Sequence, residues 1–159
     1  MSNVYVISDL HFGHKNIHKF RLGMGFNSEE EHAEYVIERW NSVITKRDTV
    51  WILGDACFTT DCLPRFKRMR GNKNLVLGNH DLDAKHFLPY FGKVCGLAKY
   101  RGAWLSHAPI HQDELRGRMN IHGHTHFVNI PDKRYFNACC ENVNFKPKLI
   151  NDILIQGDG

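Results

Sequence analysis

The sequence predicts an α/β protein in which two β-sheets pack together. In the first half of the chain, short apolar runs alternate with helical segments, the order expected for a doubly wound parallel sheet. The second half contains mainly short strand-like segments separated by turns. Hydrophobic residues make up 42% of the 159 residues and charged residues 24%, which is usual for a globular domain. At this length we expect one domain, spanning residues 1–159.

Three apolar runs predict the strands of the first sheet. They cover Val4–Ile7, Thr49–Leu53 and Asn74–Leu77, and the second and third are followed by Gly54 and Gly78. Short runs of this kind are typical of parallel strands that are buried on both faces.

The segment between the first two strands predicts an amphipathic helix. Ser28 can cap its first turn, with Glu31 as the capping-box partner three residues later. Apolar side chains then recur at helical spacing from Ala33 to Ile44. His32 lies on this helix, and we expect it to face solvent.

A shorter basic helix is expected from Pro64 to Arg70, ended by Gly71. Its basic side chains could form a nucleic-acid patch, although a solvated helix face is the favoured interpretation. The later strands are predicted at Lys93–Cys95, Ala103–Ser106, Met119–Ile121 and Arg134–Cys139, and Leu149–Leu154 closes the chain as a helix or a strand.

Composition restricts the cellular setting and the partners. The formal net charge of +4 permits an anionic partner without requiring one. Five cysteines without a C-x-x-C pair argue against disulfides and structural zinc. No apolar run has the roughly 20 residues needed to cross a membrane, and the N-terminus does not resemble a signal peptide. We therefore expect a cytoplasmic protein with no membrane partner; the sequence leaves the oligomeric state open.

Polar side chains follow five of the predicted strands at their carboxyl ends, where open α/β sheets bind ligands. The chain also has 11 histidines, and histidine is the commonest metal ligand in proteins. The five segments bring together Asp9, His11, Asp55, Asn79, His80, Asp81, His107, His124 and His126.

These side chains have the chemistry of a metal site. Two aspartates, one asparagine and four histidines form a mixed oxygen and nitrogen set, which suits Mn²⁺, Fe, Zn²⁺ or Ni²⁺ better than Mg²⁺ or Ca²⁺ alone. Seven ligands fit two ions that share a carboxylate, an arrangement suited to phosphoryl transfer. In Asp9-x-His11 and His124-x-His126, an extended backbone would point both side chains the same way.

The ordered blocks D-x-H, G-D, G-N-H-D, a lone H and G-H-x-H resemble the calcineurin-like metallophosphoesterase superfamily. They extend from Asp9 to His126. The resemblance implies a four-layer sandwich of two mixed β-sheets between helices, here without a cap domain. It also implies hydrolysis of phosphate esters with two divalent metal ions, of which manganese is the first expectation.

The resemblance also implies roles for individual residues. A hydroxide that bridges the two metals would attack phosphorus in line. His80 would contact the substrate phosphate and protonate the leaving group, with Asp81 orienting His80. The first metal would be held by Asp9, His11, Asp55 and His126, and the second by Asp55, Asn79, His107 and His124, so that Asp55 bridges.

Further residues are candidates by position alone. His14, Arg21, His111 and Arg116 follow ligands or lie in glycine-flanked loops, where they could contact a substrate phosphate or simply belong to the surface. Asn137 and Glu141 could support the ligand histidines from behind.

The leading function is a phosphodiesterase acting on nucleotide-type or small diester substrates, including nucleic-acid ends, because an open site admits an extended diester. A phosphomonoesterase with the same centre is the alternative. A non-catalytic scaffold and a nucleic-acid-binding module are less favoured.

Overall fold

The parallel centre of the first sheet is built from the three apolar runs. In the computed structural model, which describes residues 2–157, they form β1 (Val4–Ile7), β2 (Thr49–Ile52) and β3 (Asn72–Val76). The parallel strand β4 (Lys93–Cys95) extends one edge, and the antiparallel β9 (Lys148–Leu149) extends the other.

The two faces of this sheet serve two different cores. Ile7 and Ile52 pack into a core beneath the helices, whereas the adjacent Val6 and Trp51 pack toward the second sheet. Successive side chains of a strand point to opposite faces, so a sheet buried on both sides requires apolar residues at every position. The continuous apolar runs are explained by this double burial.

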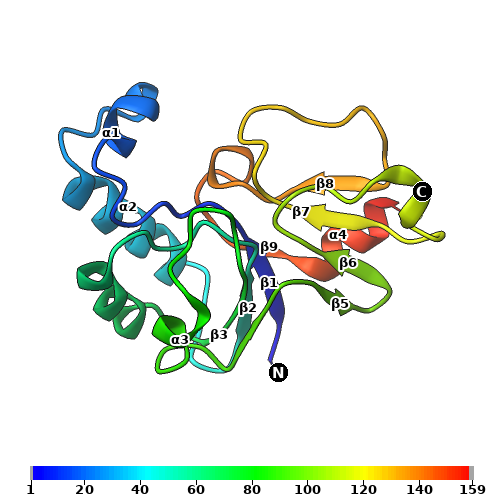
Figure 1. The fold of residues 1–159 in the computed structure, drawn as a ribbon, viewed down its shortest axis with the longest axis horizontal. Coiled ribbons are helices and arrows are strands. Elements are labelled where there is room, and N and C mark those ends of the chain that lie inside the picture. The colour runs from blue at the N-terminus through cyan, green and yellow to red at the C-terminus, as the bar shows by residue number, and fades with distance from the viewer. Residues whose placement is uncertain (1, 158–159) are drawn as a thin grey trace.

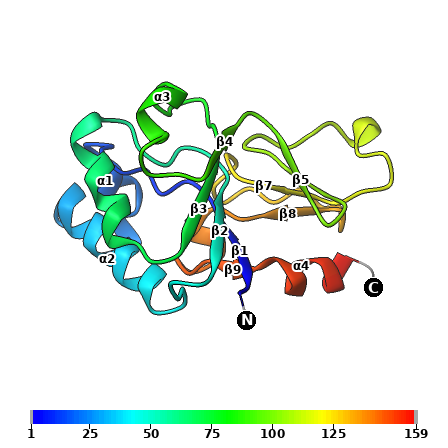
Figure 2. The same ribbon diagram turned by 90° about the horizontal axis from the view of Figure 1, so that it is seen from below.

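Helix α2 (Glu29–Asn41) covers the first sheet, as Figures 1 and 2 show. The Ser28 hydroxyl accepts the Glu31 N–H at 3.1 Å, which confirms the predicted cap. The expectation that His32 faces solvent is wrong, because His32 is fully buried. It lies one helical turn before Val36, so the buried stripe begins earlier than the apolar residues indicate.

The predicted basic helix is a longer 3₁₀ helix, η2 (Thr60–Arg68), with Pro64 inside it. Three short helical segments were not predicted: α1 (Ile17–Phe20), η1 (Leu22–Met24) and α3 (Ala84–Phe87). The last segment of the chain is both a strand and a helix, since β9 continues directly into α4 (Ile150–Gly157).

The second sheet has the strand order β5-β6-β7-β8 and is also mixed. Only β5 pairs antiparallel. The strands are β5 (Ala98–Tyr100), β6 (Ala103–Leu105), β7 (Asn120–His122) and β8 (Tyr135–Asn137). The fold therefore consists of two mixed sheets flanked by helices (Figure 2).

The two sheets join at the carboxyl ends of β1 and β8. The Ser8 N–H donates to the Ala138 carbonyl at 2.8 Å, and the Cys140 N–H donates back to the Ser8 carbonyl at 3.0 Å. The loops that follow β1, β2, β6 and β7 consequently meet at one place. The longest helix among residues 2–157 has 13 residues, and none of the described helices could cross a membrane.

Candidate metal centre

The seven predicted ligands lie together where the two sheets join. Three groups of side chains have their ligand atoms within 4.8 Å of one another, and one of them consists of Asp9, His126 and Cys139. The other two are made by Asp9, His11 and Asp55 and by Asp55, His107 and His124. Asp55 belongs to both groups. The arrangement predicted from five separate segments is therefore present among the described residues.

Asp9 has one oxygen held by the protein and the other facing imidazoles. Its Oδ2 accepts the Ser8 hydroxyl at 2.6 Å and the His124 N–H at 2.9 Å. Its Oδ1 lies 3.2 Å from His11 Nε2 and 3.6 Å from His126 Nε2. The anchored oxygen fixes the orientation of the carboxylate, which leaves Oδ1 directed at the cluster.

Asp55 is arranged in the same way between the two groups. Its Oδ1 accepts the His80 N–H at 3.0 Å. Its Oδ2 lies 3.7 Å from His11 Nε2 and 3.5 Å from His107 Nε2. One carboxylate oxygen is thus shared between a histidine of each group, as a bridging ligand requires.

The hydrogen bonds of the histidines leave lone pairs facing inward. His107 Nδ1 donates to the Leu53 carbonyl at 2.8 Å, and His126 Nδ1 donates to Glu141 Oε1 at 3.1 Å. In each neutral ring the other nitrogen, Nε2, is then an acceptor. His107 Nε2 lies 2.8 Å from Asn79 Oδ1, so two acceptors face each other unless a proton or a cation lies between them. The donor set therefore fits metal ions.

The electrostatics of the cluster also favour cations. Burial opposes ionisation of Asp9, but hydrogen bonds from His11, Ser8 and His124 outweigh it and hold the Asp9 pKa well below its usual range. For His107, burial lowers the pKa, yet the hydrogen bond with Asp55 and the charge of Asp9 leave the pKa raised. Both shifts reflect a negative potential at the centre of the cluster.

The backbone at the cluster is strained. Nine non-glycine residues in residues 2–157 have positive φ, and five of them are predicted ligands. This conformation costs an L-residue roughly 1–2 kcal/mol, and such residues concentrate at functional sites. The positive φ angles also correct the expectation that the D-x-H and H-x-H segments have an extended backbone. The five ligands are Asp9 (59°), His11 (57°), Asp55 (49°), His124 (70°) and His126 (48°).

Two motif glycines allow this packing. A Cβ atom at Gly123 would overlap Ser8 Oγ and Asp9 Oδ2, and one at Gly78 would overlap the backbone nitrogen and Oδ1 of Asp55. These glycines are required because another chain segment occupies the position of a side chain.

His80 and Asp81 have different surroundings from those predicted. His80 is exposed at the rim, with its ring centroid 5.4 Å from that of Phe58. The expectation that Asp81 orients the His80 ring is corrected, because its carboxylate is taken up by backbone N–H groups. Burial raises the pKa of Asp81 to about 6. Asp81 accepts the N–H groups of Gly78, Asp55, Ala56 and Cys57 at 2.8, 2.9, 2.7 and 3.2 Å and so ties two ligand loops together.

Of the predicted substrate residues, the structure brings only His14 to the cluster in accessible form, with its ring centroid 5.7 Å from that of His11. Arg21 is 3% exposed. It donates to the Asp9 carbonyl at 2.7 Å, to His32 Nε2 at 2.7 Å and to Glu141 Oε1 at 2.9 Å. Arg21 is therefore a buried residue that holds three segments together behind the cluster. This corrects the prediction that Arg21 contacts the substrate phosphate.

His111 and Arg116 are not brought to the cluster. The loop that follows β6 leads from His107 back to the amino end of β7, where the Ile110 N–H donates to Asn120 Oδ1 at 2.8 Å. His111 then caps the 3₁₀ helix η3 (Gln112–Glu114), and Arg116 pairs with Glu114 at 3.3 Å. The predicted ligand His124 follows the opposite end of β7, which corrects the expectation of substrate contact for both residues.

Residues behind the ligands were only partly predicted. Glu141 contacts His126, and Asn137 Nδ2 donates to the His126 carbonyl at 2.8 Å, in agreement with their predicted supporting positions. Cys139 was missed: its thiol donates to Asp9 Oδ2 at 3.3 Å. Burial and the charge of Asp9 raise the Cys139 pKa so far that the thiol stays protonated. Its position at the end of the predicted strand Arg134–Cys139 was the available signal.

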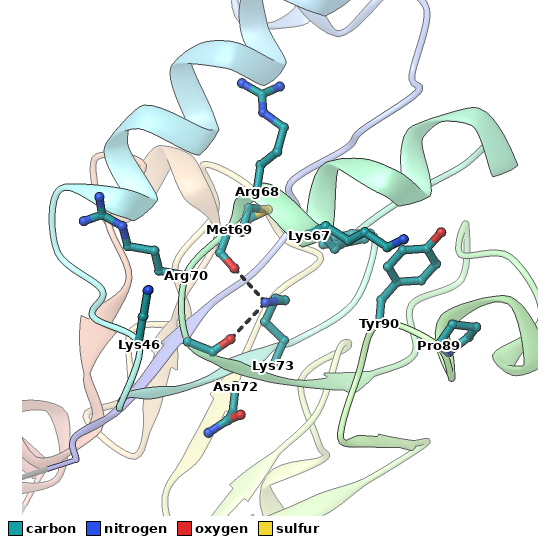
Figure 3. Close-up of a pocket in the computed structure, with 11 residues that line it drawn as sticks. Lys46, Lys67, Arg68, Met69, Arg70, Asn72, Lys73, Pro89 and Tyr90 are labelled. Carbon is teal, nitrogen blue, oxygen red and sulfur yellow. Dashed lines mark hydrogen bonds between the residues drawn. The ribbon is translucent and has the colours of Figure 1, made fainter.

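The basic run after β2 is divided between the surface and a groove. Arg68 forms an exposed pair with Glu34 on α2, as expected for a solvated helix face. Arg65 instead forms a largely buried pair with Glu29. Lys73 is 9% exposed, and its Nζ donates to the carbonyls of Met69 and Gly71 at 2.7 and 2.9 Å (Figure 3). A groove of about 380 Å³ surrounds it at the amino end of β3, away from the metal cluster, and its other cationic lining residues are Lys46, Lys67, Arg68 and Arg70 (Figure 3).

Fold and site together define a mixed α/β protein with a histidine and aspartate cluster that fits metal ions. Over 167 residues, the chain is 32% identical to the gene 66 protein of Mycobacterium phage L5, with 79% of this chain and 78% of that protein covered. The chain belongs to the same family as that phage protein.

Two further comparisons support this relationship. An uncharacterized protein of Methanocaldococcus jannaschii is 29% identical, with 98% of this chain and 91% of that protein covered. The crystal structure of a protein of unknown function from Aquifex aeolicus superposes with a TM-score of 0.79 at 25% identity, covering 98% of this chain and 99% of that chain. No protein-family model matches the chain.

Proposed function

We propose that the protein is a phosphohydrolase of the calcineurin-like metallophosphoesterase type that uses two divalent metal ions. The observation that carries this proposal is the strained cluster, in which five predicted ligands hold positive φ and Asp55 is shared between two groups. The two mixed sheets flanked by helices are compatible with the four-layer sandwich of that superfamily.

The two ions have distinct ligand sets in this proposal. Asp9, His11, Asp55 and His126 would hold one, and Asp55, Asn79, His107 and His124 would hold the other. Manganese is the preferred ion, with iron, zinc and nickel as alternatives, because the set mixes oxygen and nitrogen donors without a thiolate. When bound, the ions would activate water and neutralise charge on the phosphoryl oxygens.

The protein's own residues would position the ester and protonate its leaving oxygen. His80 lies at the rim with its backbone held on Asp55, so its imidazole can approach the leaving oxygen and donate a proton to it. Asp81 would hold the loop that carries His80 against the loop that carries Asp55, because it accepts backbone N–H groups from both loops. Arg21 and Glu141 would fix His126 from behind.

We favour phosphodiesters over phosphomonoesters. An open groove adjoins the cluster on the side of His14, so an ester group on each side of the phosphate could be accommodated. Nucleotide-type or small diesters are the proposed substrate class. Phosphomonoesterase activity of the same centre is the alternative.

The test compares hydrolysis of bis-p-nitrophenyl phosphate and p-nitrophenyl phosphate with Mn²⁺, Fe²⁺, Zn²⁺ or Ni²⁺. We expect the diester to be the better substrate, and His80→Ala to lower its turnover about 100-fold or more. His111→Ala, which changes an exposed histidine remote from the cluster, is the control. Hydrolysis at the buffer rate with every metal would refute the proposal and leave the scaffold alternative.

A nucleic-acid-binding module is the second candidate, favoured specifically by the cationic groove around Lys73. Phosphate contacts release counterions, so this function predicts an affinity for DNA or RNA that falls steeply with salt. It also predicts that the affinity survives chelation of the metals. Affinity that is lost with the metals would instead assign nucleic-acid binding to the hydrolytic centre.

A further inference from the structure

An exposed apolar surface lies beside the metal cluster. Five of the eight exposed large apolar side chains in the described part of the chain come from two short segments, Phe20–Met24 and Phe127–Val128. Phe20 is 68% exposed and Phe127 is 73% exposed. Single exposed apolar residues need no explanation, but a gathered patch usually marks a binding surface.

Phe20 and Phe127 both line two adjoining cavities of about 360 and 270 Å³. The larger cavity is also lined by His11 and His126, two of the predicted metal ligands. We call Phe20 and Phe127 the aromatic pair. A ligand in the larger cavity would therefore touch the aromatic pair and the metal cluster at the same time.

The Phe20 ring is held in place despite its exposure. Phe20 ends α1, which is anchored by the buried Ile17, and its ring meets the His14 ring edge-on at a centroid distance of 5.3 Å. Phe127 follows the ligand His126 directly in the chain. Ordered rings lose little conformational entropy when a planar ligand stacks on them.

The charges around the cavities argue against a second phosphate there. Glu141 is the one carboxylate among their lining residues in the described part of the chain. The Arg21 guanidinium beside it is already engaged with three acceptors. An uncharged planar ring suits this surface better than an anion, because it can stack on the rings and brings no negative charge toward the Glu141 carboxylate.

We propose that the aromatic pair binds the nucleobase of the substrate while the phosphate lies at the metal cluster. This inference rests on the proposed function and specifies its substrate as a nucleotide ester. Stacking on aromatic side chains is available to every base, so the site should accept all bases with a preference set by ring size. His14, which also lines the larger cavity, would then lie between the base and the cluster.

Calorimetric titration of the Mn²⁺-loaded protein tests the inference, with hydrolysis of each phosphate followed in parallel. We expect adenosine 5′-monophosphate to bind about tenfold or more tightly than ribose 5-phosphate, which lacks the base. Phe20→Ala or Phe127→Ala should each weaken the nucleotide about tenfold and leave ribose 5-phosphate unchanged. Phe127→Tyr keeps a ring and should retain affinity. Ile155→Ala, an equally exposed apolar residue on α4, is the matched control.

The inference and the proposed function can fail separately. Equal affinity for the two phosphates, or unchanged nucleotide affinity in both alanine variants, overturns the base site even if diester hydrolysis is strong. If hydrolysis is absent, titration of adenosine into the metal-free protein still reports on the base site, and loss of that binding in Phe127→Ala supports it. If the alanine variants change only the oligomeric state in size-exclusion chromatography, the patch is a contact between chains and the base site is refuted.

Discussion

The buried histidine His32 should make the protein less stable as the pH falls below about 6.5. Burial, together with the positive charge of Arg21, lowers the His32 pKa from its ordinary value of 6.5 to about 3, while the more distant Glu141 acts weakly in the opposite direction. Arg21 Nη1 donates to His32 Nε2 at 2.7 Å, which requires the ring to be neutral. The folded protein therefore excludes a proton that the unfolded chain accepts.

The sign and size of the effect follow from proton linkage. Above pH 6.5 both states carry a neutral ring, and His32 adds no pH dependence. Between pH 6.5 and about 3 only the unfolded chain binds the proton, so the free energy of unfolding falls as the pH falls. With about 1.4 kcal/mol for each pH unit, lowering the pH from 6.5 to 4.5 removes roughly 2–3 kcal/mol.

Urea unfolding of the chelated protein at pH 7.5, 6.5, 5.5 and 4.5 measures this loss. His32→Gln keeps an acceptor for Arg21 but cannot titrate, so its stability should fall by roughly 2–3 kcal/mol less than that of the wild type over this range. His111→Gln removes an exposed histidine and should follow the wild type. Parallel pH profiles for the wild type and His32→Gln would show that the reasoning about His32 is wrong.

Other substitutions test the cluster. Asp55→Ala removes the shared carboxylate, so elemental analysis should find bound Mn²⁺ falling from two ions per chain toward none, whereas His126→Ala should retain one. Gly123→Ala introduces the overlap described above and should destabilise the protein by roughly 1–3 kcal/mol in thermal unfolding. Gly23→Ala, which meets no atom within 4 Å, should be nearly neutral. Asp81→Asn replaces an acceptor of four N–H groups and should lower stability by about 1–3 kcal/mol.

The sequence predicts well those features that depend on local pattern. β1 matches its predicted range, and β2 and β3 differ from theirs by one or two residues at their ends. Burial on both faces explains the apolar runs of β1 and β2, whereas β3 begins with Asn72 and Lys73, which the predicted run left out. The clustering of the predicted ligands could also be anticipated, since each lies in a loop within a few residues of the carboxyl end of a strand. α1 and β5 (Ala98–Tyr100) were not predicted: each is only three or four residues long and includes polar residues, so neither forms an apolar run or a helical stripe.

The errors concern contacts between distant segments. An arginine in a glycine-flanked loop is expected at the surface, since an unpaired buried charge is costly. Arg21 is buried because three segments converge on it, contributing the Asp9 carbonyl, His32 and Glu141. Glu141 lies 120 residues from Arg21 in the chain, so no local pattern could reveal the pairing. The prediction that His111 and Arg116 contact the substrate was wrong for the opposite reason, because their loop turns away from the cluster.

The identity of residue 32 follows from the same set of contacts. His32 accepts from Arg21, Arg21 pairs with Glu141, and Glu141 accepts from His126. A neutral imidazole satisfies one N–H of Arg21 without competing for its positive charge, so that charge remains paired with Glu141 and keeps the His126 ring oriented toward Asp9. A carboxylate at position 32 would share the charge of Arg21 and weaken its pairing with Glu141. One of the 11 histidines therefore lies behind the cluster, where a buried acceptor is needed that adds no negative charge.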